Sequence, residues 1–317
     1  MTQDKTAQNK KLSFIMTVNN LEGVIAPLLE SVALSRIQEV EYVLVDRASE
    51  DRTLPEAIGK IREMNLTAVT IQNGFGSAAS ALNTGRFRAT GDYVKFITPQ
   101  LYGEKLKELF ENTIESSSGR DMILPVRESI AASPVTLSGQ SALELLLYSN
   151  GIPEFGAILY SREFLSENGL RMTESSQMDG LGLELTIKAL ARAGSVQLVP
   201  MEFSPVRIRK ELFIPNRSEF SSFLCVDGVE RALENIRHLP AIRPSIIDGL
   251  LQYYLPQKLM EAIEELLEEG RGYTAVANYI RIHNYGRFLE TRGIKNSLLR
   301  KKINRWRRMP WLYRRRK

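Results

Sequence analysis

The sequence predicts an α/β fold, in which a mostly parallel sheet is sandwiched by helices and is followed by a helical C-terminal extension. From Lys11 to about Arg127, short apolar runs alternate with segments of helical length, as in folds built from strand-helix-strand units. The runs are apolar on both faces, as expected where helices cover a sheet on two sides. From about Ser218 onward the chain reads as nearly all helical.

Five runs rich in Val, Ile, Phe and Thr predict the strands of the first region. They are Leu12 to Val18, Tyr42 to Asp46, Leu66 to Gln72, Asp92 to Thr98 and Met122 to Val126. Three segments between them have helical length, namely Leu21 to Ser35, Asp51 to Met64 and Ser77 to Ala89.

The pattern loosens after Arg127, through a stretch rich in small residues, and then resumes. It predicts helices at Ala142 to Tyr148 and Leu181 to Ala193, a helical turn in SREFLSENG, and strands at Glu154 to Tyr160 and in SVQLVP. Further on, an apolar stripe recurs at helical spacing and is expected to pack in a core. Its members are Leu259, Met260, Ile263, Leu266 and Leu267.

Composition indicates a folded globular protein and disfavours several kinds of chemistry. Of the 317 residues, 43% are hydrophobic and 25% are charged, which is ordinary for a globular chain. One cysteine, Cys225, and two histidines give no support to an internal disulfide, a cysteine zinc cluster or a histidine-centred triad. Neither a secretory signal nor an apolar span of about 18 residues is visible, so we expect a cytoplasmic protein.

The residues that follow the predicted strands are the first candidates for a site. In an open parallel sheet, ligands bind beyond the carboxyl ends of the strands, and four of these ends carry polar or amide side chains. They are Thr17 and Asn19 after the first strand, Asp46 after the second, Asn73 and Asn83 after the third, and Thr98 and Gln100 after the fourth. Taken one at a time, such residues are more often parts of turns or helix ends.

The glycines after the third strand do not form a dinucleotide-binding fingerprint. Gly74 to Ala79 reads GFGSAA, without the third glycine of G-x-G-x-x-G, and it follows the third strand rather than the first. No G-x-x-x-x-G-K-[ST] occurs either. A Rossmann dehydrogenase is therefore disfavoured and a P-loop nucleotidase is excluded.

Four motifs between about Lys11 and Arg209, in this order, resemble the family 2 glycosyltransferases of the GT-A fold, which build bacterial cell-surface polysaccharides. The first strand runs into a turn that ends in asparagine, FIMTVNN, and the second reads VDRASEDRT where the family has V-D-D-x-S-x-D-x-T. NGFGSAASALNTG is a loose match to N-x-G-F-G-x-A-x-N-x-G. GDYVKFI matches G-D-Y-[VI]-x-F-[LI] throughout.

The resemblance implies transfer of a sugar from a UDP-, dTDP- or GDP-linked donor. It implies that Asp46 accepts hydrogen bonds from the base of the nucleotide, with Thr17 beside it, and it assigns Asn19 and Asn73 to the same donor site. In the family, Asp-x-Asp or Asn-Pro-Asp after the fourth strand holds a divalent cation, Mg²⁺ or Mn²⁺, against the diphosphate. Here that motif reads Thr98-Pro99-Gln100.

The second aspartate of V-D-D is likewise replaced, by Arg47, so two substitutions remove negative charge from one pocket. Gln100 would bind a cation only weakly through its carbonyl oxygen. One interpretation is that cations of the protein neutralise the diphosphate, since arginine matches phosphate geometry. The candidates are Arg47, Arg207, Arg209 and Lys210. The alternative is an inactive homologue that acts as a binding or scaffold partner.

The resemblance also implies a general base for the acceptor hydroxyl. Family members carry an acidic residue, often in Glu-Asp, at the start of a helix after the acceptor-side strand, and SSQMDGLGLELTIKALARAG resembles that segment. Asp179 would be the base of an inverting transfer, with Met178 in the place of the common glutamate. Glu184 is the alternative.

The charge of the chain is strongly uneven. Residues 292–317 hold 12 Lys/Arg and no Asp/Glu, whereas the preceding 291 residues carry 30 basic and 37 acidic side chains. Tryptophan and leucine interleave with these cations, as in helices that lie on a membrane surface. We expect this tail to hold the protein at the inner face of the cell membrane, beside a lipid-linked acceptor; a merely solubilising tail is the alternative. No nucleic-acid partner is expected.

These observations predict four segments. They are a polar N-terminal tail (1–10), a GT-A-like transferase domain (11–215), a helical C-terminal region (216–291) and a basic amphipathic tail (292–317). The sequence leaves the sugar, the acceptor and the homo- or hetero-oligomeric state open.

Overall fold

The structure, a computed structural model, divides into two compact units. It describes residues 12–33, 40–72, 74, 76–97, 100–101, 119–153, 155–174, 180–201, 206–207 and 219–308. The sheet unit comprises 1–139, 153–178 and 192–216, and the helical unit comprises 140–152, 179–191 and 217–317. The helical unit therefore contains two helices that precede residue 216 in the sequence.

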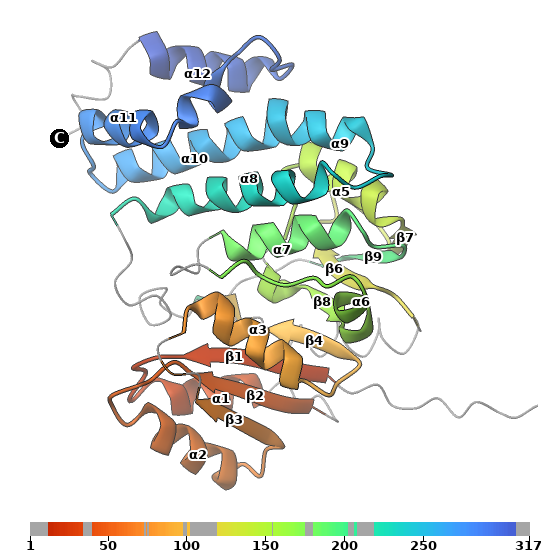
Figure 1. The fold of residues 1–317 in the computed structure, drawn as a ribbon, viewed down its shortest axis with the longest axis vertical. Helices are drawn as coiled ribbons and strands as arrows, with labels where there is room; N and C mark the ends of the chain where they lie inside the picture. Colours follow the sequence, from red (N-terminus) through yellow and green to blue (C-terminus); the bar gives the residue numbers. More distant parts are fainter. Residues whose placement is uncertain are drawn as a thin grey trace, which may run out of the picture. The chain divides into compact units, whose positions relative to one another are not determined.

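A mixed sheet of eight strands lies at the centre of the sheet unit (Figure 1), in the order β3-β2-β1-β4-β8-β6-β9-β7. β1, β2, β3 and β4 are mutually parallel, whereas β8 and β7 run antiparallel to their neighbours. The strands are β1 (Leu12–Val18), β2 (Val40–Asp46), β3 (Ala68–Gln72), β4 (Tyr93–Phe96), β6 (Met122–Val126), β7 (Val135–Leu137), β8 (Leu159–Ser161) and β9 (Val196–Pro200).

Helices cover both faces of β1 and β2, as the sequence predicts, whereas the side chains of β3 are partly or largely exposed. Leu12, Phe14, Met16 and Val18 pack in one core with α1 (Ile25–Ala33) and α2 (Thr53–Glu63). The opposite face of β1 and β2 lies against α3 (Ala78–Arg88) (Figure 1). The remaining elements of this unit are η1 (Phe155–Ala157), α6 (Arg162–Glu167) and a two-stranded antiparallel pair of β5 (Gln100–Leu101) and β10 (Val206–Arg207).

Several elements of the sheet unit differ from the prediction, and among them the short strands β5 and β10 were not predicted. The expected strand Glu154 to Tyr160 is divided into the 3₁₀ turn η1 and the short strand β8. β7 was not predicted, because its side chains are mostly exposed and form no apolar run. Its pairing with the edge of β9 makes it a strand, and that pairing involves residues about 60 positions apart, beyond the reach of local patterns.

The helical unit is built around α8 (Leu224–Ile236) and α10 (Leu255–Glu268), which pack side by side (Figure 1). The predicted stripe on α10 is confirmed, since Leu259, Met260, Ile263 and Leu266 are buried. The other elements are α5 (Gly139–Tyr148), α7 (Leu181–Leu190), η3 (Ser221–Phe223), α9 (Pro244–Gly249), the π-helical turn η4 (Leu250–Tyr254), α11 (Tyr273–Ile282), η5 (Tyr285–Leu289) and α12 (Ser297–Arg308).

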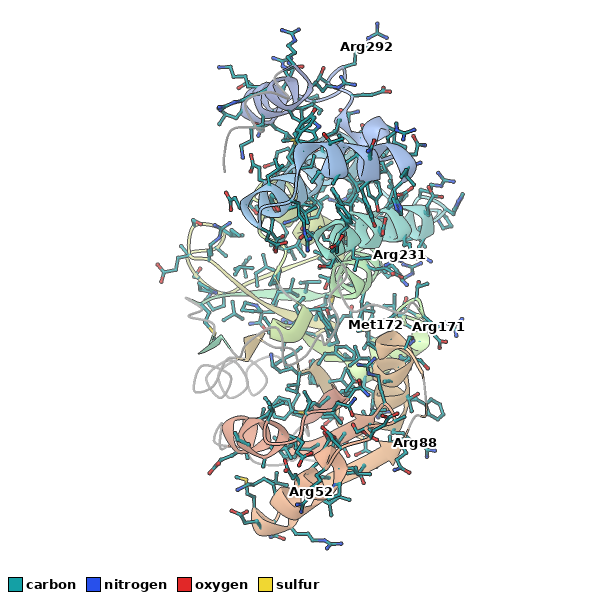
Figure 2. The ribbon with its side chains drawn as sticks, turned by 90° about the vertical axis from the view of Figure 1, so that its left-hand side faces the viewer. Arg52, Arg88, Arg171, Met172, Arg231 and Arg292 are labelled. Carbon is teal, nitrogen blue, oxygen red and sulfur yellow. The ribbon has the colours of Figure 1, made fainter. Side chains whose placement is uncertain are left out.

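The basic tail forms helix α12 over its described part. Three of its apolar side chains, Leu299, Ile303 and Trp306, are buried, whereas Leu298 is exposed. Because α12 packs on α10, the three buried side chains belong to the core of the unit. Arg292, just before α12, projects outward (Figure 2). No helix in the described part of the chain is both long and apolar enough to span a bilayer.

The contact between α3 and the sheet leaves no room for a side chain at Gly85. A Cβ atom there would lie 2.4 Å from Cγ2 of Ile15 and 3.2 Å from Cγ2 of Val45.

We expect Gly85→Ala to lower the free energy of unfolding by about 1–3 kcal/mol through overpacking, measured by urea denaturation. Gly59→Ala on α2 is the control, because nothing lies within 4 Å of its Cβ position and a stabilisation of about 0.5–1 kcal/mol is expected there. Equal effects of the two substitutions would contradict this packing.

Candidate functional site

The turns that follow β1 and β2 are joined by hydrogen bonds. The side-chain amide of Asn19 donates to the Arg47 carbonyl at 2.8 Å. The Asn20 backbone N–H donates to Ser49 Oγ at 3.0 Å, and the Glu50 N–H donates to Asn20 Oδ1 at 2.9 Å. These bonds hold the two strand ends as one rigid rim, with Asn19 positioning the backbone of Arg47.

The buried carboxylate of Asp46 holds the turn after β2 through hydrogen bonds. Its side chain is 2% exposed, and its carboxylate accepts a hydrogen bond from Ser49 Oγ at 2.5 Å and longer ones from the Ser49 N–H at 3.3 and 3.4 Å. Between them Ala48 has a φ of 53°, in the left-handed region that non-glycine residues seldom adopt. The carboxylate therefore stabilises a strained turn, and the role expected for it in binding the base stays a prediction.

The strand register separates Thr17 from Asp46. Val18 is paired with Asp46 and Thr17 with Val45, and side chains of neighbouring residues on a strand leave opposite faces of the sheet. Thr17 thus shares the α3 face with Val45, whereas Asp46 continues the face covered by α1 and α2. This differs from the expected placement of Thr17 beside Asp46.

At this rim, Thr17 Oγ1 and Arg47 Nε are buried and have no hydrogen-bond partner among the residues that the structure describes. Burial lowers the pKa of Arg47, and the negative charge of Asp46 opposes that shift. Buried polar atoms are nearly always paired in folded proteins, and exceptions often mark the place of a ligand or an ion. The two atoms come from neighbouring strands, so one ligand with an oxygen-rich anionic group could satisfy both.

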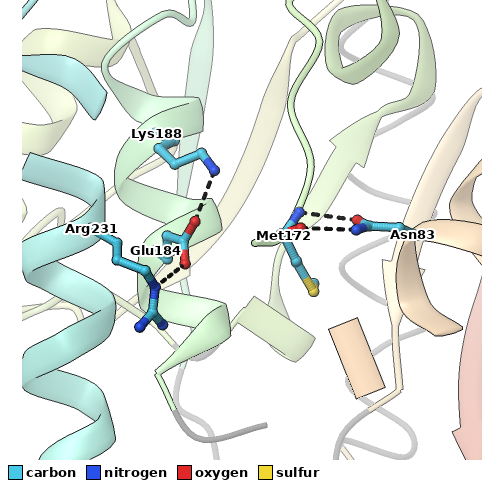
Figure 3. A network of polar contacts seen from close by, with 5 residues as sticks. All are labelled: Asn83, Met172, Glu184, Lys188 and Arg231. Carbon is cyan, nitrogen blue, oxygen red and sulfur yellow. Dashed lines mark hydrogen bonds and ion pairs between the residues drawn. The ribbon is translucent and has the colours of Figure 1, made fainter. Parts of the chain in front are cut away.

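Asn83 has a structural role that its sequence position did not reveal. Its Nδ2 donates to the Met172 carbonyl at 2.8 Å, and its Oδ1 accepts from the Met172 N–H at 3.0 Å (Figure 3). The Asn83 side chain thus holds the segment after α6 against α3. This segment leads along the chain towards Asp179.

The structure brings together two predicted site residues that are far apart in the sequence. Gln100 on β5 is paired with Arg207 on β10 in an antiparallel register. The candidates Asn73, Thr98, Asp179, Arg209 and Lys210 lie outside the described residues, as does Pro99.

Glu184 is committed to ion pairs within the helical unit. It is 1% exposed, and its two carboxylate oxygens bind Lys188 Nζ at 2.9 Å and Arg231 Nε at 2.8 Å (Figure 3). A base that accepts a proton from an acceptor needs a free lone pair facing it. The structure therefore disfavours Glu184 as the alternative base.

The residues described at the rim do not fit a divalent cation. Mg²⁺ and Mn²⁺ prefer several carboxylate and carbonyl oxygens, whereas Asp46 is engaged with Ser49 and is followed by the cation Arg47. Within the described ranges no group of three or more His, Cys, Asp or Glu is arranged to hold a metal.

Lys95 is an unexpected charged group in the core of the sheet unit. It lies on β4 opposite Phe14 of β1 and is 1% exposed, and its Nζ donates to the Gly156 carbonyl in η1. Burial lowers its pKa to about 7. In the sequence, the signal for a buried charge is the lysine in the middle of the apolar run YVKFI. The residue ties β4 to η1 through a hydrogen bond.

The lowered pKa of Lys95 predicts a pH-dependent stability. Between pH 7 and about 10.5 the unfolded chain binds a proton that the folded chain has released, so stability rises with pH in this window. From pH 7.5 to 9 we expect a rise of about 2 kcal/mol in the free energy of unfolding of the wild type, relative to Lys95→Met. Urea denaturation at several pH values measures it; parallel curves for the two proteins would contradict a titrating Lys95.

Comparisons with known proteins agree with this architecture. Residues 13–99, which contain β1 to β4, match the model of the glycosyl transferase family 2. The comparison with curated proteins gives no match.

Among solved structures, the chain resembles Staphylococcus aureus TarS 1–349, with 16% identity over 94% of this chain and 91% of that chain and a TM-score of 0.54. TarS 1–349 in complex with UDP-GlcNAc gives 14% identity over the same shares of the two chains and a TM-score of 0.53. The Pyrobaculum calidifontis mannosyltransferase PcManGT, in complex with GDP-Man and Mn²⁺, gives 16% identity over 96% of this chain and 88% of that chain and a TM-score of 0.54. At these identities the likeness shows the fold, and the GT-A architecture expected from the sequence is confirmed.

Proposed function

We propose that this protein is a glycosyltransferase that moves a sugar from a nucleotide-sugar donor to a glycan acceptor. The observation that carries the proposal is a pair of buried polar atoms at neighbouring strand ends, Thr17 Oγ1 and Arg47 Nε, which have no partner among the described residues. They lie within the segment that matches the glycosyl transferase family 2. Two neighbours of the same fold are complexes with UDP-GlcNAc and GDP-Man, which supports a nucleotide-sugar ligand here.

Arg47 is assigned to the diphosphate of the donor. Negative charge develops on the leaving nucleoside diphosphate as the glycosidic bond breaks, and a fixed guanidinium stabilises that charge in the transition state. The hydrogen bond from Asn19 and the turn held by Asp46 keep Arg47 in place before the donor arrives. Arg207, paired with Gln100 across β10 and β5, is a second candidate cation.

Asp179 is assigned to the acceptor. As general base, it would take the proton of the attacking hydroxyl, which approaches the anomeric carbon from the face opposite the leaving group, so that the configuration is inverted. This assignment comes from the sequence motif alone. The committed ion pairs of Glu184 support it by disfavouring the alternative base.

Binding of the donor nucleotide tests the proposal. We expect UDP or GDP to bind the full chain in calorimetric titrations, and Arg47→Ala to weaken that binding about 10- to 100-fold, the worth of hydrogen bonds to a charged group. Arg52→Ala is the control, because Arg52 lies on the same loop and is exposed (Figure 2). Each titration is repeated with Mn²⁺.

The outcomes separate the alternatives. Nucleotide binding that depends on Arg47 and not on Mn²⁺ supports this arginine as the cation that neutralises the diphosphate in place of a metal ion. Binding that strengthens with Mn²⁺ and ignores Arg47 would contradict that role. If neither nucleotide binds under either condition, the donor site is refuted, and the scaffold alternative replaces the enzyme.

We also propose that α12 holds the protein at an anionic membrane surface mainly by charge. Its apolar side chains Leu299, Ile303 and Trp306 are buried in the helical unit and are not available for insertion into lipid, whereas Leu298 is 70% exposed. Its outer side carries exposed cations, of which Lys302 is paired with Glu264 at 2.9 Å. The others on the described part of α12 are Arg300, Lys301, Arg305, Arg307 and Arg308. Such binding is worth about 1 kcal/mol per charge and is screened by salt.

Vesicle sedimentation tests this membrane contact. We expect the protein to bind vesicles that contain phosphatidylglycerol, to ignore neutral phosphatidylcholine vesicles, and to dissociate at high salt. Replacing Lys301 and Arg305 together by alanine should weaken binding about 30-fold, whereas Arg281→Ala on α11, also an exposed cation, should have little effect. Equal binding to neutral vesicles would indicate insertion instead, and no binding to either kind would leave a solubilising helix.

A further inference from the structure

Two arginines of the sheet unit, Arg86 and Arg171, lie near the place where the segment after α6 is tied to α3. Asn83 holds Met172 of this segment through two hydrogen bonds, at 2.8 and 3.0 Å (Figure 3). Arg171 directly precedes Met172 (Figure 2). Arg86 follows Asn83 by three residues, which is the spacing of neighbours on one face of a helix. The tie therefore brings Arg171 towards the part of α3 that carries Arg86.

The guanidinium of Arg86 carries buried donors that no described residue satisfies. Its Nε and Nη1 are both buried and have no hydrogen-bond partner among the described residues. Arg120 and Arg271 also have a buried Nε without such a partner, but each of them donates a hydrogen bond through Nη1. Buried polar groups are nearly always paired in folded proteins, and exceptions often mark the place of a ligand or an ion. Two such nitrogens on one side chain therefore indicate a partner that the described residues do not supply.

The charges that act on Arg86 favour an anion as that partner. Burial lowers the pKa of its guanidinium, and the positive charge of Arg171 lowers it further. The carboxylates nearest to the two arginines in the sequence, Glu174 and Asp92, are not partners of the buried Nε and Nη1. A guanidinium nevertheless stays charged in proteins. Its buried donors therefore lie in a positive environment that an anion would stabilise.

We propose that Arg86 anchors a second oxyanion site, which takes a phosphate group against α3, beside Arg171. Guanidinium N–H groups match the oxygens of a phosphate in charge and direction. The buried donors of Arg86 gain acceptors, and both arginines are attracted to the anion instead of only repelling each other. Arg171 contributes through its charge, which acts over several ångströms and does not require a free guanidinium. A bound phosphate thus joins the segment after α6 to α3, alongside the two bonds of Asn83.

This site lies away from the candidate donor rim at Thr17 and Arg47. α3 starts beyond the carboxyl end of β3, at the edge of the sheet where the parallel strands β1 and β2 also end. Arg86 lies eight residues after Ala78, the first residue of α3, which is about 12 Å along the helix axis. The phosphate site is therefore independent of sugar transfer, and its test does not require a working donor site.

Calorimetric titration of the full chain with inorganic phosphate and with glycerol 1-phosphate tests the site. The ionic strength is held constant and the probes stay at low concentration, because concentrated phosphate stabilises folded proteins without specific binding. We expect the wild type to bind and Arg86→Met to lose at least about tenfold in affinity, the worth of one charge-assisted hydrogen bond. Arg88→Met is the matched control, because Arg88 is an exposed cation of the same helix (Figure 2), and it should bind as the wild type does.

Thermal unfolding separates a binding site from a packing role. Methionine keeps an unbranched apolar stem and removes the buried N–H groups, so without phosphate Arg86→Met should unfold at the same temperature as the wild type or at a higher one. Phosphate should raise the unfolding temperature of the wild type and leave that of Arg86→Met unchanged, because only a protein that binds the ligand is stabilised by it. Arg86→Lys keeps the charge but lacks the directed donors, and it should lose most of the phosphate binding.

The outcomes distinguish the source of the phosphate and the failure of the site. Tighter binding of glycerol 1-phosphate than of inorganic phosphate supports a phosphate group of a larger molecule, and the reverse order supports free phosphate. No binding by the wild type, or equal affinities of the wild type and Arg86→Met, would overturn the site. Loss of binding in Arg47→Ala but not in Arg86→Met would assign the anion to the donor rim instead. An equally lowered unfolding temperature of Arg86→Met with and without phosphate would leave Arg86 a packing role only.

Discussion

The parallel register of β1 against β2 is the constraint on which the candidate donor site depends. It sets Val18 opposite Asp46, so the two strands end level and their turns can be joined by Asn19, Asn20 and Ser49. A slip by one residue would move every side chain to the other face of the sheet. Thr17 would then leave the α3 face, which it shares with Val45.

Each of the two units contains a buried carboxylate and an arginine that are used in the same way. In each, a buried carboxylate is used internally, Asp46 by Ser49 and Glu184 by Lys188 and Arg231. In each, an adjacent arginine retains guanidinium nitrogens without a protein partner among the described residues, Arg47 in the sheet unit and Arg231 in the helical unit. On the proposed function, Arg47 serves the diphosphate of the donor.

Several features of the fold and the site followed from local sequence. β1 and β6 span the predicted residues, and α2 and α3 begin and end within two residues of the prediction, because apolar runs and helix-length segments record which faces are buried. The motif order also led to the GT-A fold that the structural comparisons support. β7, the Lys95 hydrogen bond to η1 and the bonds between Asn83 and Met172 were not predicted. Each joins residues dozens of positions apart, which no local pattern specifies.

The sequence by itself determined the alternation of elements, the polar character of the strand ends and the charge of the tail, since these are properties of neighbouring residues. Tertiary structure alone decided how those residues are used. It turned Asp46 and Asn83 into structural ties, buried most of the apolar side chains of α12 and committed Glu184 to two cations. The physical reason is that a polar or apolar side chain acquires its role from the partners that folding brings to it, and those partners lie far away along the chain.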